Sequence, residues 1–250
     1  MIRLVRAEFL KLRTTQVWFW LLLAAVAIAA LLVVAQMASN SVKSGADVAG
    51  MFTSSVTAYV PVFVLGVLGV TTEFRYQTIT PTVLGTPSRW SLISAKMIAY
   101  AIVGALYALV CVAVQLAVAV PWLAAKNINY SLGSDDIPHA LIGVFAVVAL
   151  FGIIGLGAGA LLRNQIVAVT VGVLFLLVLQ QILVAIPGVK HAYPFLPGGA
   201  MSSILATTGS DKSFNGVTLL PIGGGIVVLL LWAFVPAIIG ASVTMNRDIT

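Results

Sequence analysis

Polar residues suited to specific contacts are concentrated in one stretch of an otherwise apolar chain, TTEFRYQTITPTVLGTPSRWSLISAK, which runs from Thr71 to Lys96. Glu73 and Arg75 offer opposite charges where an apolar segment has just ended, and the hydroxyl and guanidinium groups that follow offer hydrogen bonds. We interpret this stretch as a contact surface for another protein. Its candidate contact residues are Glu73, Arg75, Thr78, Thr80, Thr86 and Arg89.

Catalysis and metal binding have no recognisable pattern in the sequence. It contains no P-loop, no paired catalytic carboxylates and no cysteine or histidine cluster with metal-ligand spacing. His139 and His191 would need further ligands to hold a metal, and Cys111 lies in an apolar run where a small packed residue is expected. We therefore expect no catalytic residue, no metal site and no cofactor bound by this chain.

Hydropathy predicts the membrane-spanning helices on either side of the polar stretch. The chain has 250 residues, of which 61% are hydrophobic and 8% are charged, a composition typical of an integral membrane protein. A helix that crosses the hydrocarbon core needs about 20 predominantly apolar residues. The sequence predicts an all-α membrane protein, a single domain over residues 1–250 with spans at 17–38, 51–70, 97–120, 140–162, 166–186 and 221–243.

The distribution of positive charge predicts the orientation of these spans. Lysine and arginine are most frequent in the N-terminal segment and in the connection between the second and third spans. Because cytoplasmic loops carry an excess of these residues, both termini and the stretch 71–96 are expected in the cytoplasm. The net charge of +6 is explained in the same way, and we expect no nucleic-acid partner.

Residues 1–16 predict an amphipathic helix. Ile2, Val5, Phe9 and Leu12 recur at helical spacing and form one apolar stripe. We expect the helix to lie at the membrane surface with this stripe in lipid and its cations toward the headgroups, although a plain basic tail is the alternative. The charged residues of this helix are Arg3, Arg6, Glu8, Lys11 and Arg13.

The remaining features of the spans are neutral polar residues and glycines. No Asp, Glu, Lys, Arg or His lies in the middle of any span. Ion-coupled carriers usually place such groups near the midplane, so the chain has no visible energy source of its own. Gly155 and Gly159 have a spacing that permits close helix packing, within this chain or with another. Three amides are expected either to hydrogen-bond between helices or to line a substrate path: Gln115, Gln180 and Gln181.

Five segments together resemble the permease subunits of bacterial ABC-2 type ABC transporters. They are EFRYQTITPTVLGTPSRWSLISAK, RAEFLKLRTT before a Trp-rich first span, GLGAGALLRNQIVAV between the fourth and fifth spans, YPFLPGGA in the last external loop, and the tail NRDIT. Each is weak alone, but they occur in the matching order and cover nearly the whole chain.

The resemblance implies a type V exporter arrangement with an N-terminal elbow helix at 1–16 and a cytoplasmic coupling helix within 71–96. It also implies external re-entrant helices at about 193–205, within the loop 187–220, for which a plain loop is the alternative from the residues alone. Such a permease works as a pair of identical or related six-span chains with two separate ATPase subunits that bind ATP and Mg. It lies in the cytoplasmic membrane of a bacterium.

The expected function is therefore ATP-driven export of an amphipathic or lipophilic substrate, such as a drug, an antimicrobial peptide or a lipid. Glu73 is expected to act as a charge clamp with Arg75 or with basic residues of the N-terminal helix or the tail, and Glu73→Ala to uncouple ATP hydrolysis from transport while expression stays intact. A non-transporting binding or sensor module that recruits a cytoplasmic partner is the alternative. A lipid-modifying enzyme ranks last, because Glu73 is the only acidic residue in position to serve it.

Overall fold

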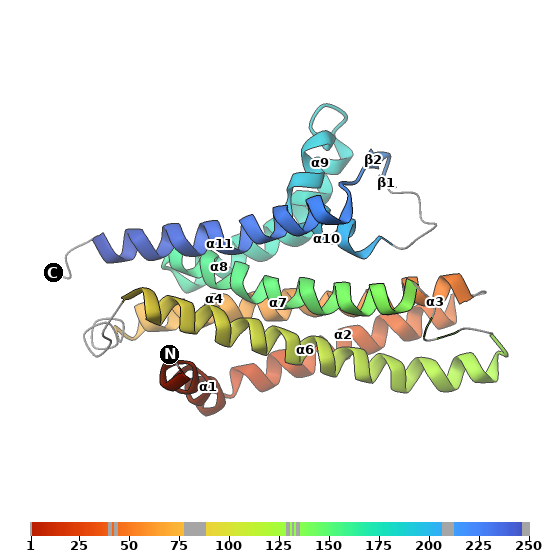
Figure 1. Cartoon of the computed structure of the whole chain (residues 1–250), viewed down its shortest axis with the longest axis horizontal. Coiled ribbons are helices and arrows are strands. Elements are labelled where there is room, and N and C mark those ends of the chain that lie inside the picture. Colours follow the sequence, from red (N-terminus) through yellow and green to blue (C-terminus); the bar gives the residue numbers. More distant parts are fainter. Residues whose placement is uncertain are drawn as a thin grey trace.

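The protein is largely helical, and among the described residues six helical segments are long and apolar enough to cross a membrane (Figure 1). The computed structural model describes residues 2–39, 42, 45–77, 89–128, 131, 133, 136–206 and 213–246. The six candidate spans are Val17–Ala38, Asp47–Arg75, Ser91–Ala125, Asp136–Leu162, Gln165–Ala185 and Ile222–Gly240. The prediction of a multi-pass, all-α membrane protein is confirmed at this level.

The described residues form one hairpin and a series of helices. In chain order they are α1 (Ile2–Thr14), α2 (Val17–Ala38), α3 (Gly45–Thr53), the 3-10 helix η1 (Ser54–Ala58), α4 (Tyr59–Arg75), α6 (Arg89–Ala125), α7 (Asp136–Leu162), α8 (Gln165–Leu174), the π-helical turn η2 (Phe175–Leu179), α9 (Gln180–Ala185), the 3-10 helix η3 (Lys190–Phe195), α10 (Pro197–Leu205) and α11 (Ile222–Asn246). A two-stranded hairpin, β1 (Ser213–Phe214) and β2 (Val217–Thr218), precedes α11.

The second span extends beyond its predicted end at residue 70. Its last helix, α4, continues to Arg75. Thr71 and Thr72 fit into the helix because their hydroxyls donate to the carbonyls of Val67 and Leu68, at 2.8 and 2.6 Å. The polar end of α4 is therefore a continuation of the span and not a separate loop.

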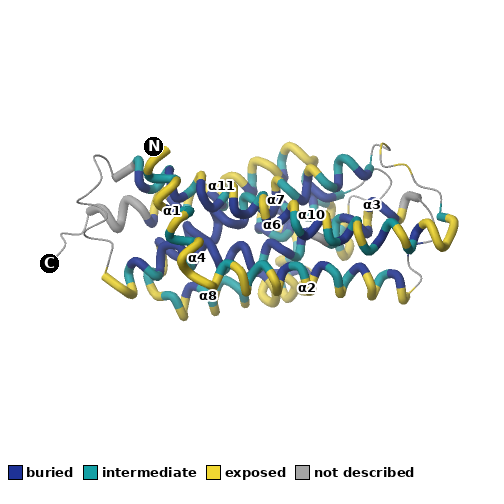
Figure 2. Tube along the Cα trace, turned by 90° about the horizontal axis from the view of Figure 1, so that it is seen from below, coloured by how far each residue is buried: buried dark blue, intermediate teal, exposed yellow. Residues whose placement is uncertain are grey.

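Helix α7 lies at the centre of the fold and packs against α4, α6 and α11 (Figures 1 and 2). Close packing is possible because glycines face the neighbouring backbones. A Cβ atom at Gly159 would lie 2.8 Å from the carbonyl oxygen of Val67, and one at Gly155 would overlap the carbonyl oxygen of Phe63. The spacing of Gly155 and Gly159 thus serves a contact within the chain, between α7 and α4.

The segment after the fifth span is ordered into two short helices. η3 and α10 pack together, and α10 lies against α11 (Figure 1). Trp232 of α11 donates from Nε1 to the carbonyl of Phe195 at 2.9 Å. The alternative of a plain loop is wrong for residues 190–205, whereas re-entry of these helices into the membrane stays a prediction.

The packing of α4 on α7 is tested by Gly155→Ala. The added methyl group meets the backbone of Phe63, which cannot rotate away, so we expect the free energy of unfolding to fall by about 1–3 kcal/mol. Gly223→Ala is the matched control, because a Cβ there meets nothing within 4 Å. A lower midpoint of thermal unfolding for the first variant only supports this packing, and equal midpoints contradict it.

Candidate functional site

Four charged side chains from three helices meet where α1, α4 and α6 converge. The ammonium of Lys96 on α6 donates to Glu73 Oε1 of α4 at 2.7 Å and to Glu8 Oε1 of α1 at 2.8 Å. Lys11 of α1 donates to the same Glu73 oxygen at 2.6 Å. We call Glu8, Lys11, Glu73 and Lys96 the ion-pair network.

The ion-pair network is buried except at one edge. Glu8, Glu73 and Lys96 are 5%, 3% and 4% exposed, whereas the side chain of Lys11 is 38% exposed. Two carboxylates and two ammonium groups cancel in formal charge, so no net charge is removed from water. The three buried members depend strongly on one another, because removal of one leaves its partner uncompensated.

The ammonium of Lys96 uses its third donor as well. It lies 3.5 Å from the carbonyl oxygen of Gly69, one turn before Glu73 on α4. The ring of Tyr100 lies directly against Gly69, where any side chain would collide with it. The three donors of the ammonium thus all point at acceptors, which fixes α6 in one position along α4.

Helix α1 presents Glu8 to this site from the middle of its inward face. Val5, Glu8, Phe9 and Leu12 are spaced so that they share one side of the helix, and the three apolar members pack against the hydrophobic core of the protein. These three side chains therefore contact protein as partly buried residues, and their contact with lipid stays a prediction. Ile2 is the exception, at 86% exposed. The stripe turns inward because Glu8, which lies within it, is paired with Lys96.

The sequence contained a signal for Glu8 and Lys96 that the predictions missed. Glu8 is the only acidic residue in 1–16 and interrupts an apolar face. Lys96 is likewise surrounded at helical spacing by residues that are buried: Leu92, Ala95, Ala99 and Tyr100. A charge inside an apolar face predicts a buried partner. The prediction instead counted Lys96 only among the positive charges that orient the spans in the membrane.

One partner of Glu73 is among those that the sequence allowed, and the other, Lys96 of α6, is not. The allowed partner is Lys11, a basic residue of the N-terminal helix. Arg75 contacts Gln165 instead, with Nη1 donating to Oε1 at 3.4 Å. The burial of Glu73 also changes the expectation for Glu73→Ala, because two ammonium groups would lose the carboxylate that they share, so a loss of stability is expected with it.

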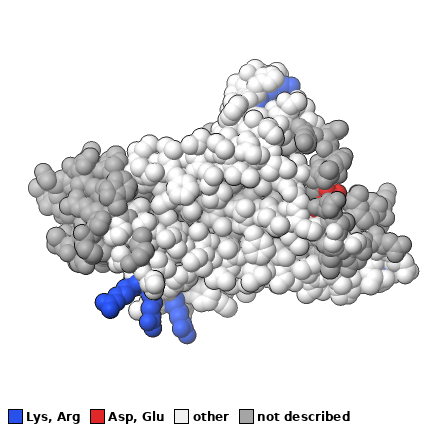
Figure 3. Space-filling view, viewed as in Figure 1, with Lys and Arg blue, Asp and Glu red and all other residues white. Residues whose placement is uncertain are grey.

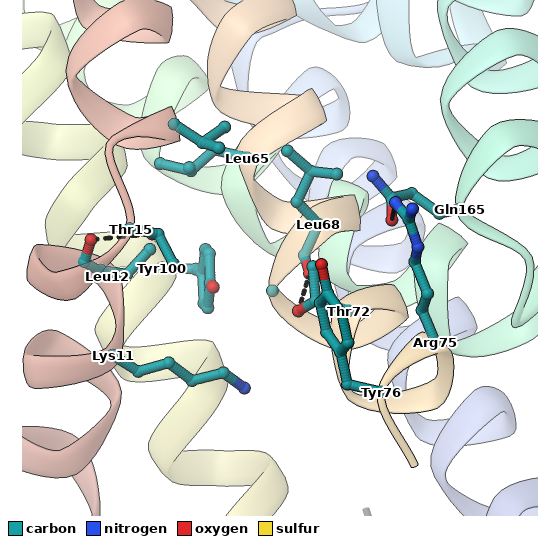
Figure 4. A pocket seen from close by; sticks show the side chains of 12 residues that line it. Lys11, Leu12, Thr15, Leu65, Leu68, Thr72, Arg75, Tyr76, Tyr100 and Gln165 are labelled. Atoms are coloured by element: carbon teal, nitrogen blue, oxygen red, sulfur yellow. Dashed lines mark hydrogen bonds between the residues drawn. The ribbon is translucent and has the colours of Figure 1, made fainter. Parts of the chain in front are cut away.

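A cavity of about 240 Å³ opens beside the ion-pair network, between α1 and α4 (Figure 4). Lys11 and Thr15 line it from α1 and its end, and Thr72 and Arg75 line it from α4. Tyr100 lies between the two sides. Gln165 of α8 also lines the cavity. The ion-pair network therefore lies next to a cavity that extends from α1 past the end of α4 to α8.

The other predicted contact residues lie around this end of the molecule or outside the described residues. Thr78, Thr80 and Thr86 are outside the described residues, and of Arg89 only its place at the beginning of α6 is described. Three cations of α1 are exposed: Arg3, Arg6 and Arg13. Basic side chains project from the lower edge of the molecule, over α1 (Figure 3).

Comparison with known proteins gives no relative for this chain: no protein-family model matches it, and no curated protein matches it. Among the described residues, no group of three or more His, Cys, Asp or Glu side chains is placed to hold a metal ion. The function is therefore argued from the geometry of the chain itself.

The three amides differ in their surroundings. Gln115 on α6 is buried and donates to Ser54 Oγ of η1 at 2.8 Å. Gln180 is buried and its Oε1 accepts from the amide of Gly198 at 2.6 Å, which joins α9 to the beginning of α10. Gln181 is exposed. Two of the three thus hydrogen-bond between elements of this chain, and a role in a substrate path stays a prediction.

Removal of Lys96 tests the ion-pair network. Lys96→Met leaves Glu8 and Glu73 facing one another in a buried site, and we expect a loss of about 3–5 kcal/mol in the free energy of unfolding. Lys11→Met removes the half-exposed edge of the network and is expected to cost at most about 1 kcal/mol. The measurement is unfolding of the purified chain in detergent. Equal losses for the two variants would contradict the buried geometry.

A double-mutant cycle separates the pair from the rest of the network. Lys96→Met leaves the carboxylate of Glu8 without its partner, and the double variant Glu8→Gln with Lys96→Met removes that carboxylate charge as well. We therefore expect the double variant to lose less free energy of unfolding than the sum of the two single losses, by about 1 kcal/mol or more. Strict additivity would show that the 2.8 Å contact carries no coupling. Lys126→Met, at the far end of α6, is the control and is expected to change little.

Proposed function

We propose that this chain is the membrane-spanning permease subunit of an ATP-driven transporter, powered by separate ATPase subunits. The observation that supports the proposal most is the ion-pair network, which ties α1, α4 and α6 together at the end of α4. The connection that follows α4 is the stretch proposed to contact the ATPase. A force applied there would reach three helices at once.

A mechanical path from this connection into the membrane follows from the packing. Lys96 fixes α6 to α4, and α4 is in turn packed against the central helix α7 by direct glycine-to-backbone contacts. Coupling between distant sites needs such a chain of packed elements that move as a unit. In the proposed mechanism, closure of the ATPase dimer displaces α4 and α6. Helix α7 moves with them because its glycines are in direct contact with the backbone of α4.

The energy source and the partners belong to the same proposal. The sequence has no Asp, Glu, Lys, Arg or His in the middle of the six spans, which favours a supply of energy from a partner. ATP and Mg would be bound by that partner. A second six-span permease, identical or related, would complete the path for an amphipathic or lipophilic substrate. Both termini would lie in the cytoplasm of a bacterium, with the chain in its cytoplasmic membrane.

Affinity purification from native membranes tests the assignment. We expect the tagged chain to co-purify with an ATPase subunit that carries a Walker A motif and with a second permease chain. Recovery of the chain without ATPase activity contradicts the proposal. Ligand binding by a complex that moves nothing across a membrane would favour the sensor module.

The role of the network in coupling is tested with Glu73→Gln, which keeps the shape of the side chain and removes its charge. We expect the complex to assemble and hydrolyse ATP, while substrate moved per ATP falls by about tenfold or more, because α4 no longer holds α6. Lys126→Gln is the control for the loss of one charge at the other end of α6. Transport by Glu73→Gln at the wild-type ratio would refute this role.

A further inference from the structure

We propose that a pocket at the junction of α7 and α8 binds the phosphate group of an anionic membrane lipid. The pocket has a volume of about 370 Å³ and lies between the end of α4 and the turn that joins α7 to α8. Thr71, Phe74 and Arg75 line it from α4, and residues 163–166 line it from the turn and α8. It is separate from the ion-pair network, and the proposal does not depend on the transport function.

Arg163 is the central residue of this pocket. It has a positive φ of 52°, which makes the sharp turn between the two helices, and its guanidinium lies over the ring of Phe74 at 5.9 Å. Its Nη2 is buried and has no hydrogen-bond partner within the described residues. A guanidinium carries five N–H donors in a planar fork that matches a phosphate group. A buried donor without an acceptor is costly, and a phosphate oxygen would supply that acceptor.

The rest of the pocket is also suited to an anion. Arg75 supplies a second guanidinium, held by its hydrogen bond to Gln165. Asn164 caps α8 beside the pocket, where its Oδ1 accepts from the amides of Ile166 and Val167 at 3.0 and 3.2 Å. The described residues that line the pocket include two arginines and no acidic residue. The positive end of α8 adds to this potential.

The surroundings of the pocket point to a lipid as the source of the phosphate. Two candidate spans end beside the pocket, at Arg75 and Leu162, and a third begins there, at Gln165. The apolar side chains next to the pocket are exposed: Leu161 and Leu162 at 43% each, Ile166 at 78% and Val167 at 43%. Exposed apolar groups beside arginines at the ends of spans are typical of the boundary between hydrocarbon and headgroups. A phosphodiester of a membrane lipid occupies that level.

The test is lipid binding by the purified full chain in detergent, measured by native mass spectrometry. We expect phosphatidylglycerol to bind more tightly than phosphatidylcholine. Arg163→Gln is expected to weaken the binding of phosphatidylglycerol by about tenfold, and Arg163→Lys by less, because lysine keeps the charge but not the fork. Lys126→Gln, a loss of one charge far from the pocket, should leave binding unchanged.

Two outcomes would overturn the proposal. One is equal binding of phosphatidylglycerol by the wild type and Arg163→Gln, or no preference over phosphatidylcholine. The other is displacement of the lipid by inorganic phosphate at equal concentration, which would assign the site to a free phosphate. If Arg163→Gln fails to fold, Arg75→Gln decides the question in its place, since it removes an exposed guanidinium and is expected to weaken binding several-fold.

Discussion

The structure depends on one buried ammonium group. Lys96 carries a charge into a site that is 4% exposed, and it is stable there only because Glu8 and Glu73 approach it from two other helices. This requirement determines where α1 lies, which way its apolar face turns and where α6 stands along α4. An apolar contact would leave these helices free to slide, whereas three directed acceptors do not.

The helices are held together by different contacts at the end of α4, around Lys96, and at the middle of the molecule. At the middle, α4, α6 and α7 are held by close backbone contacts at glycines, which are short-ranged and apolar. At the end of α4, charged side chains hold α4 to α6 and to α1. A partner that contacts the end of α4 therefore acts on a rigid group of helices, and the pocket lined by Arg75 and Arg163 lies beside the same end.

The sequence predicted the spans well, because hydropathy over about 20 residues reports directly on the cost of placing a segment in hydrocarbon. It also predicted that Glu73 would be paired. It did not predict the pairing of Glu8 with Lys96, which are 88 residues apart and meet only through packing. The periodicity of α1 defined an apolar face, but lipid and protein core are equally apolar, so the pattern could not tell which one the face contacts. The glycine spacing likewise predicted close packing without naming the partner helix.

The most direct measurement is hydrogen–deuterium exchange of α1 in the full chain, with and without Lys96. In the wild type, the amides of Ile2–Thr14 should be protected, because Glu8 holds the helix against α6. In Lys96→Met, these amides should exchange about tenfold faster or more, while those of α7 stay protected. Unchanged protection of α1 in Lys96→Met would show that the helix is held by something other than the ion-pair network and would contradict the account.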